Sequence, residues 1–458
     1  MQNDTIAAIA TGLSDAGISI IRISGKEAFS IADSIFLPKK KGKVLSEQKS
    51  HTMHYGHIVE QKQIIDEVLV SIMRAPHTYT AEDIIEINCH GGVFVTKKIL
   101  QCVLAKGARL AEPGEFTKRA FLNGRMDLSQ AEAVMDLIHA KNERAMKNSI
   151  GQLRGNLFEK IQEIRTKILR DTAYIEAVLD DPEHYTLEGF SEELLEHISE
   201  IKMQLNQMIA SAEDGRMIKE GIRTAIVGKP NVGKSSLLNL LAGEERAIVT
   251  EIAGTTRDTV EEMIKMRGIC LHLIDTAGIR DTKDIVEKIG VEKAKKSAER
   301  ADFILYVVDT SSVLDEEEEE LIEWLKPKKA VVLLNKSDLI ANITKQELEQ
   351  KTGKQVFSIS TKTGQGMEEL YDTIEKMFFQ KEIDFDDEIM ITSERQKQAF
   401  LLARESIQKV EESIELSMPE DFFSIDLMAA YNALGTIIGE EVDEDLINTI
   451  FKEFCMGK

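Results

Sequence analysis

The stretch Gly228-Lys-Pro-Asn-Val-Gly-Lys-Ser235 decides the fold of the middle of this chain. It matches the pattern G-x-x-x-x-G-K-[ST], whose glycines let the backbone curl until its N–H groups face a phosphate chain. An apolar run, 224–227, precedes the stretch, and a helix-like run, 236–242, follows it. This strand–loop–helix context predicts a phosphate-binding loop at a helix N-terminus, with Lys234 on the outer phosphates and Ser235 on Mg²⁺.

Further segments with the chemistry of a nucleotide site follow in order. The polar segment Gly254-Thr-Thr-Arg-Asp258 offers Thr256, whose hydroxyl would complete the Mg²⁺ shell. A buried strand is predicted at 271–274, and it leads into Asp275-Thr-Ala-Gly278. An acid at that strand end suits the Mg²⁺ shell, and Gly278 lets its own N–H approach the γ-phosphate.

The base is predicted to be guanine. Apolar strands are expected at 303–308 and 330–334, and the second ends in Asn335-Lys-Ser-Asp338. The Asp338 carboxylate can accept hydrogen bonds from guanine N1–H and from its 2-amino group, whereas adenine offers neither donor. Ser360-Thr-Lys362 follows a strand expected at 356–359 and would close the base pocket through backbone N–H groups.

One position departs from Ras-type GTPases, which place a water-orienting glutamine directly after Asp-x-x-Gly. Here the residue is Ile279, whose side chain cannot orient water. Acids on the next segment, Asp281, Asp284 and Glu287, are candidates for that role. The alternative is that each is an ordinary solvated charge, which sequence alone favours for any one of them.

Length and composition predict a multidomain protein of the cytoplasm. A chain of 458 residues is too long for one core, so two to four domains are expected. No apolar run approaches the ~18 residues needed to span a membrane, and Asp4 lies where a secretory signal would be basic. The four cysteines are scattered without a C-x-x-C pair, which indicates a reducing compartment and neither a disulfide framework nor a structural zinc site.

The net charge of −22, from 57 basic and 79 acidic residues, excludes a strong non-specific nucleic-acid binder. Any RNA contact would use a local basic face or the surface of a partner. The densest acidic run, 316–320, is interpreted as the solvated start of a helix.

Periodicity predicts a multidomain fold of the α+β and α/β classes. Strands are expected at 18–23, 68–73 and 84–87, with a turn at Cys89-His-Gly-Gly92 before a helix at 93–104. A second region is helical, with apolar residues three and four apart along one stripe: Ile150, Leu153, Leu157, Ile161, Ile164 and Ile168.

Helices are also expected at 192–212, 396–416, 425–434 and 444–454, on both sides of the nucleotide-binding part. This arrangement predicts a Ras-like P-loop domain inserted into a helical domain, although two unrelated helical segments would show the same periodicity. The expected boundaries are an N-terminal α+β domain at 1–120, a helical domain at 121–215 and 381–458, and a G domain at 216–380.

The chain resembles the family of tRNA-modifying GTPases called MnmE or TrmE over its whole length. The segments that carry the resemblance lie in every predicted domain: Asp4-Thr-Ile-Ala-Ala8, Ile21-Arg-Ile-Ser-Gly25, Thr80-Ala-Glu-Asp-Ile84, Glu112-Pro-Gly-Glu-Phe116, Arg119-Ala-Phe-Leu-Asn123, Asp127-Leu-Ser-Gln-Ala-Glu-Ala133, Ile252-Ala-Gly-Thr-Thr-Arg-Asp258 and Phe454-Cys-Met-Gly-Lys458. The C-terminal Cys-x-Gly-Lys ending beside such an N-terminal domain is more specific than a P-loop alone.

The resemblance implies a role in tRNA wobble-uridine modification. Members of this family work with an FAD-dependent partner, MnmG (GidA), in a heterotetramer that builds a carboxymethylaminomethyl group on uridine 34 of certain tRNAs. Their N-terminal domain forms a homodimer and binds 5-formyltetrahydrofolate or a related folate. Carried over by motif, the folate contacts would be Arg22, Glu82, Arg125 and Lys458.

The resemblance also implies a potassium-activated GTPase. Asn231, Thr250, Ile252 and Thr255 would hold K⁺, while Ser235 and Thr256 would hold Mg²⁺. Glu287 aligns with the acid that positions the attacking water, so the expected catalytic residues are Glu287, Lys234 and Thr256. The G domains of two subunits would meet when GTP and K⁺ are bound. The full set of expected GTP contacts is Asn231, Gly233, Lys234, Ser235, Ser236, Thr250, Thr255, Thr256, Asp275, Gly278, Asn335, Lys336, Asp338, Ser360, Thr361 and Lys362.

A second hypothesis is a regulatory GTPase that binds ribosomal RNA or assembly intermediates and carries out no transfer chemistry. Assembly factors of that kind usually append a basic RNA-binding domain, and the sequence shows no such block.

Overall fold

The computed structural model describes residues 4–40, 42–181, 184, 190–244, 262–266, 269–274, 298–378, 389–416, 418–419, 421–440, 442–452, 454 and 457. The chain divides into two compact units, which are described separately. The first unit comprises residues 1–135, 152–186 and 418–458, and the second comprises 136–151 and 187–417.

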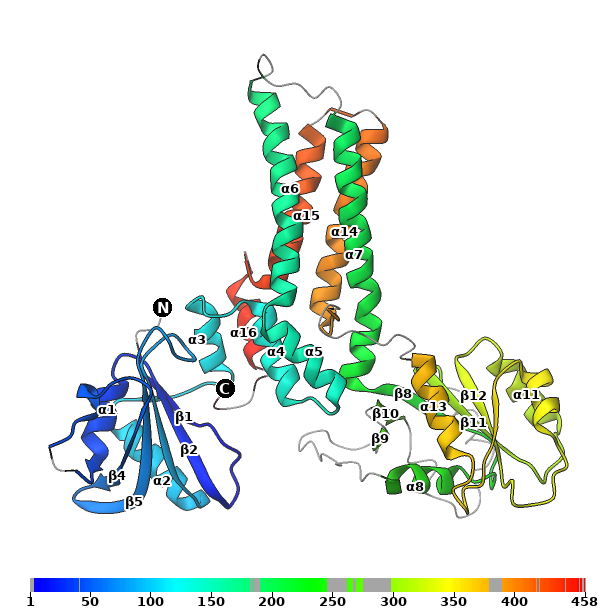
Figure 1. The fold of residues 1–458 in the computed structure, drawn as a ribbon, viewed down its shortest axis with the longest axis horizontal. Helices are drawn as coiled ribbons and strands as arrows, with labels where there is room; N and C mark the ends of the chain where they lie inside the picture. Colours follow the sequence, from blue (N-terminus) through cyan, green and yellow to red (C-terminus); the bar gives the residue numbers. More distant parts are fainter. Residues whose placement is uncertain are drawn as a thin grey trace. The chain divides into compact units, whose positions relative to one another are not determined.

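The first unit contains a mostly antiparallel sheet in the order β3-β4-β5-β6-β2-β1-β7 (Figure 1). Its strands are β1 (Ile6–Ile9), β2 (Ala16–Ser24), β3 (Phe36–Pro38), β4 (Thr52–Glu60), β5 (Gln63–Met73), β6 (Ile84–Gly91) and β7 (Arg109–Leu110). The helices α1 (Ala28–Ile35) and α2 (Val93–Ala105) share one apolar core with the sheet, and a 3₁₀ turn lies at η1 (Leu45–Glu47). The prediction of an α+β N-terminal part is confirmed.

The predicted turn at Cys89-His-Gly-Gly92 is wrong for its first three residues, which belong to β6. Cys89 and Gly91 pair with Ser19 and Ala16 of β2, so the ladder continues to the strand end. A Cβ at Gly91 would lie 2.4 Å from the Ala16 carbonyl oxygen. Gly91 therefore serves a close strand–strand approach, which sequence alone cannot distinguish from a turn.

The remaining helices of the first unit come from both ends of the chain. They are α3 (Glu115–Leu122), the greater part of α4 (Leu128–Ile138), α6 (Asn156–Asp180), α15 (Asp421–Ile438) and α16 (Glu444–Lys452). The helix α6 runs along α15, although some 250 residues separate them in sequence (Figure 1). In the second unit, α7 (Phe190–Glu220) pairs in the same way with α14 (Glu394–Glu415).

These pairings confirm that the G domain is inserted into a helical domain, because helices before it pack against helices after it. They exclude two unrelated helical segments. The apolar stripe from Ile150 to Ile168 does not lie on one helix, however. It is divided between α5 (Glu143–Leu153) and α6, because Gly155 adopts a φ of +96° that an α-helix does not allow.

The G domain in the second unit has a mostly parallel sheet in the order β13-β12-β11-β8-β10-β9. Its strands are β8 (Ile222–Val227), β9 (Glu262–Met266), β10 (Ile269–Leu273), β11 (Phe303–Asp309), β12 (Ala330–Asn335) and β13 (Val356–Ser358). The described helices here are α8 (Lys234–Glu244), α11 (Glu316–Leu325), α12 (Lys345–Thr352) and α13 (Met367–Phe378). Apolar clusters cover both faces of the sheet, which explains the near-continuous apolar strands.

The acidic run at 316–320 does begin a helix, as predicted. Asp315 caps α11 by accepting from the Glu318 N–H, and the Glu318 side chain is buried while its acidic neighbours are exposed. Among the described residues, no helix is both long and apolar enough to cross a bilayer.

Candidate functional site

The predicted phosphate-binding loop leaves the carboxyl end of β8 and enters α8. Gly228 has a φ of +155°, and a Cβ there would lie 2.3 Å from the Val307 carbonyl oxygen of β11. Gly233 has a φ of +103°, and a Cβ there would lie 2.2 Å from the Asn335 amide nitrogen. Both positions thus require glycine for backbone conformation and for space.

Lys234 folds back over this loop. Its Nζ donates to the carbonyl oxygens of Gly228 at 2.8 Å and Lys229 at 2.5 Å. Burial lowers the pKa of Lys234 to about 8. The loop therefore holds a partly desolvated cation. An anionic phosphate chain bound there would neutralise its charge.

Asn335 connects the phosphate loop to the predicted base loop. The side chain is fully buried, donates to the Val232 carbonyl at 2.8 Å and accepts from the Thr361 N–H at 3.0 Å. It also lies 3.3 Å from the Thr361 hydroxyl. Its amide therefore holds two loops together, and this contact positions the predicted base loop beside the phosphate loop.

Asp338 lies on the exposed side of this junction. The Ser360 hydroxyl donates to its Oδ1 at 2.7 Å, and this hydrogen bond lowers the pKa of Asp338 below its ordinary value. Nearby, Lys336 has a φ of +64° and its Nζ contacts Asp309 Oδ2 at 2.5 Å. The structure thus presents an ionised, oriented carboxylate as a hydrogen-bond acceptor, as reading a guanine edge requires.

Some of the other expected nucleotide contacts lie in the described part of the chain, and the rest lie outside it. Asn231 is exposed with a φ of +63°, Ser235 and Ser236 begin α8, and Thr361 and Lys362 follow the buried Ser360. Several expected residues lie outside the described part of the chain, as does Ile279: Thr250, Ile252, Thr255, Thr256, Asp275, Gly278, Asp281, Asp284, Glu287 and Lys458.

A second cluster in the first unit brings together two of the expected folate residues, Arg22 and Arg125. Arg22 on β2 contacts Glu86 Oε1 at 2.8 Å and donates to the Gly457 carbonyl at 3.4 Å. Its guanidinium carbon lies 5.4 Å from the centre of the Tyr79 ring, and that of Arg125 lies 5.1 Å from the same ring. The structure therefore brings Arg22 and Arg125 to one aromatic side chain.

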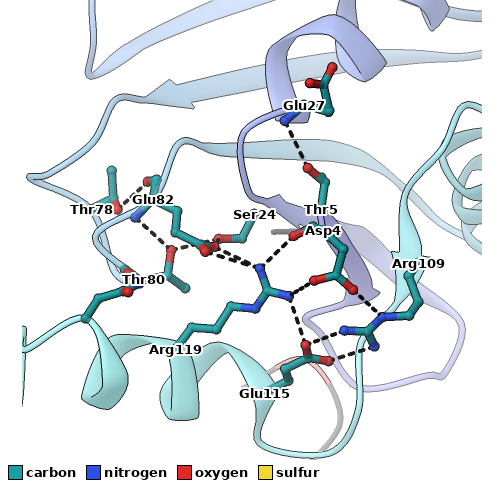
Figure 2. Close-up of polar contacts among 11 residues, drawn as sticks. Asp4, Thr5, Ser24, Glu27, Thr78, Thr80, Glu82, Arg109, Glu115 and Arg119 are labelled. Atoms are coloured by element: carbon teal, nitrogen blue, oxygen red, sulfur yellow. Dashed lines mark hydrogen bonds and ion pairs between the residues drawn. The ribbon is translucent and has the colours of Figure 1, made fainter. Parts of the chain in front are cut away.

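Glu82 is held by an acid–arginine network, defined as Asp4, Glu82, Arg109, Glu115 and Arg119 (Figure 2). Arg119 Nη1 donates to Glu82 Oε1 at 3.2 Å, and its Nη2 contacts Asp4 at 2.8 Å and Glu115 at 3.0 Å. The Ser24 hydroxyl donates to Glu82 Oε2 at 2.7 Å.

The arginines of the network lower the pKa of Asp4 and of the buried Glu115 below their ordinary values. Burial acts to raise the pKa of Glu115, but hydrogen bonds from Arg109, the Glu112 N–H and Arg119 lower it below its ordinary value. A carboxylate in such a setting is fixed in orientation, which suits Glu82 to reading the polar edge of a ligand.

Sequence reasoning did not assign a role to Arg119 or to Tyr79. Arg119 opens the Arg119-Ala-Phe-Leu-Asn123 segment that carries the family resemblance, so a signal was present. Tyr79 precedes the Thr80 segment and gave no signal of its own, because its two arginine contacts come from distant parts of the chain.

Two family models match this chain. The family described as MnmE helical domain matches residues 128–455, and the family described as GTP-binding protein TrmE N-terminus matches 5–125. The chain is 62% identical, over 458 residues and 100% of both chains, to the tRNA modification GTPase MnmE of Lachnoclostridium phytofermentans. The chain belongs to the MnmE family.

Other relatives align over nearly the same length. The chain is 51% identical to the tRNA modification GTPase MnmE of Thermoanaerobacter pseudethanolicus, over 99% of both chains. Among solved structures, it is similar to Aquifex aeolicus Era bound to GDP·AlF4⁻, with 33% identity, 40% of this chain and 66% of that chain covered, and a TM-score of 0.28.

Proposed function

We propose that this member of the MnmE family is a K⁺-activated GTPase which, with the FAD-dependent partner MnmG, adds a carboxymethylaminomethyl group to uridine 34 of certain tRNAs. As a family member, the chain is a GTP hydrolase of tRNA modification. The observation that carries the guanine assignment is the exposed Asp338 carboxylate, which Ser360 orients next to the loop tied down by Asn335.

The donor set at the phosphate loop fits hard cations. Ser235 offers a hydroxyl at the start of α8, and Asn231 offers an amide oxygen on an exposed turn. We infer that Ser235 and Thr256 hold Mg²⁺, and that Asn231 with Thr250, Ile252 and Thr255 holds K⁺. Such cations neutralise charge that develops on the phosphates. Lys234 would bind the outer phosphates, and Glu287 would orient the attacking water in place of the glutamine that Ile279 replaces.

We further propose that residues 1–120 bind a folate through Arg22, Glu82, Arg125 and Lys458 and form the homodimer. The cations Arg22 and Arg125 around Tyr79 support this proposal, because a folate carries carboxylates, and the fixed acid Glu82 suits the pterin edge. In this proposal, GTP binding brings the G domains, 216–380, of two subunits together, and the helical parts 121–215 and 381–458 transmit the change to the heterotetramer.

A cytoplasmic location is consistent with the thiols. Cys89, Cys102 and Cys270 are buried and free, and burial raises the pKa of Cys89 and Cys270. Protonated, buried thiols are compatible with a reducing compartment.

The proposed function is tested by quantifying modified uridine 34 in tRNA from a strain that lacks the gene. We expect the modification to disappear and to return with the wild-type chain but not with an Asp338→Asn chain. Unchanged modification in the deletion strain would contradict the proposal and favour the regulatory, RNA-binding alternative. Co-purification of a flavoprotein with the wild-type chain tests the partner independently.

A further inference from the structure

Lys229 is a cation of the phosphate loop that the proposed nucleotide site does not use. Its loop follows β8, and β8 lies beside the parallel strand β11, with Val227 opposite Tyr306. The segments that follow these two strands therefore leave the same edge of the sheet. There the Lys229 ammonium donates to the Asp315 carboxylate, 86 residues further along the chain. This ion pair ties the phosphate loop to the start of α11.

Asp315 is itself held by the first turn of α11. Its Oδ1 accepts from the Glu318 N–H at 3.1 Å and caps the helix, while its Oδ2 accepts from Lys229. The Glu318 side chain accepts in turn from the Asp315 N–H at 3.4 Å. Because the helix end fixes the carboxylate, Lys229 is bound to a fixed group, and only 18% of its side chain is exposed.

The backbone of Lys229 contributes to the position of Lys234. Its carbonyl oxygen accepts from Lys234 Nζ at 2.5 Å, beside the Gly228 carbonyl oxygen at 2.8 Å. Among the described residues, the partners of the Lys234 ammonium are these two carbonyls and no carboxylate. The two lysines therefore differ, because Asp315 matches the charge of Lys229, whereas the charge of Lys234 stays available for phosphate.

We propose that Asp315 is a positioning residue for nucleotide binding. By holding the Lys229 side chain it fixes the first residues of the phosphate loop, so that the Lys229 carbonyl orients Lys234 toward the phosphates. It also keeps the Lys229 ammonium from competing with Lys234 for the same anion. The inference rests on the nucleotide site of the proposed function, and it adds a residue that lies outside the nucleotide-binding motifs of the sequence.

Two simpler roles of Asp315 predict different results. If Asp315 only caps α11, asparagine should replace it without effect, because asparagine caps helices equally well. If Asp315 acts only as a negative charge near the phosphates, its removal should tighten nucleotide binding. The positioning role predicts weaker binding, so the direction of the change separates the three roles.

The test measures the affinity of the full-length protein for a fluorescent GDP in the presence of Mg²⁺, together with the dissociation rate constant. Asp315→Asn should weaken binding by about two- to fivefold, the range that a partly exposed ion pair allows, mainly through faster dissociation. In a Lys229→Met background the same substitution should have no further effect, because the side chain through which Asp315 acts is gone. Lys229→Arg should restore most of the affinity that Lys229→Met loses, because a guanidinium pairs with the same carboxylate.

Glu319→Gln is the matched control. Glu319 lies in the first turn of the same helix, is exposed, and pairs with Lys351 of α12 at 2.8 Å rather than with the phosphate loop. Its substitution removes one negative charge from the same helix end, as Asp315→Asn does. This variant should bind GDP like the wild type.

The outcomes separate this inference from the nucleotide function. A wild type that does not bind GDP would contradict the proposed nucleotide site and this inference with it. If the wild type binds, three results would overturn the role of Asp315 and leave the nucleotide site standing. They are unchanged or tighter binding by Asp315→Asn, the same loss in the Lys229→Met background or in Glu319→Gln, and a Lys229→Arg variant as weak as Lys229→Met.

Discussion

At the scale of single residues, the nucleotide site depends on the positions of a few charged and polar side chains. The sequence predicted that Asp338 reads guanine and that Lys234 reaches phosphate from motif spacing alone. It could not predict that Asn335 is buried and committed to Val232 and Thr361, because that depends on two loops meeting in space. The same limit applies to Arg119, whose partners Asp4, Glu82 and Glu115 come from separate segments.

Asp338→Asn should change the base preference. An amide cannot accept both guanine hydrogen bonds, but its NH₂ group matches the carbonyl that xanthine carries in place of the amino group. We expect GTP affinity to fall by roughly ten- to a hundredfold and affinity for xanthosine triphosphate to rise. Equilibrium binding of both nucleotides measures this, and a variant that still rejects the xanthosine nucleotide would contradict the pocket assignment.

The lowered pKa of Lys234 predicts that nucleotide affinity depends on pH. Without ligand the ammonium loses its proton near pH 8, whereas bound phosphates favour the charged form. Binding therefore takes up a proton above pH 8, and affinity should fall as the pH rises. From pH 7 to 8.5 we expect about a fourfold weaker affinity for GDP.

Lys234→Arg is the matched control, since its guanidinium stays charged throughout this range. Its affinity should vary little between pH 7 and 8.5. A flat profile for the wild type, or equal slopes for both proteins, would show that Lys234 is not the titrating group.

At the scale of elements, helix α7 contains a close chain crossing that apolar periodicity cannot predict. The sequence predicted a helix over 192–212, and α7 extends through Phe190–Glu220. Gly215 lies inside it, and a Cβ there would lie 2.0 Å from the Ile391 carbonyl oxygen. A glycine in a helix interior lowers helix stability, so its presence here reflects the close crossing of the chain segment that leads into α14.

Gly215→Ala should therefore destabilise the protein by about 1–3 kcal/mol, because the backbone at Ile391 must move. Gly243→Ala in α8 is the matched substitution, since a Cβ there has nothing within 4 Å. It should be neutral or stabilising by about 0.5–1 kcal/mol. Chemical denaturation of both variants beside the wild type checks this, and equal midpoints for the two would refute the close-crossing explanation.

At the scale of the whole molecule, the sequence predicted the order of parts better than their contacts. Turn chemistry and apolar periods indicated a P-loop domain inside a helical one. The pairings α6 with α15 and α7 with α14 needed the structure, because nothing in either helix specifies its partner. The break at Gly155 was missed for a related reason, since the apolar stripe continues across it.

We propose that a monovalent cation held by Asn231 and a carboxylate from Glu287 replace the glutamine that Ras-type GTPases use. It concerns the molecule as a whole, because the G domains of two subunits are expected to meet when GTP and K⁺ are bound. The most direct measurement is the steady-state rate of GTP hydrolysis in KCl and in NaCl at equal ionic strength, for the wild type and for Asn231→Ala. We predict that the wild type is several-fold or more faster in KCl and that Asn231→Ala loses this difference. Equal wild-type rates in the two salts would contradict the account.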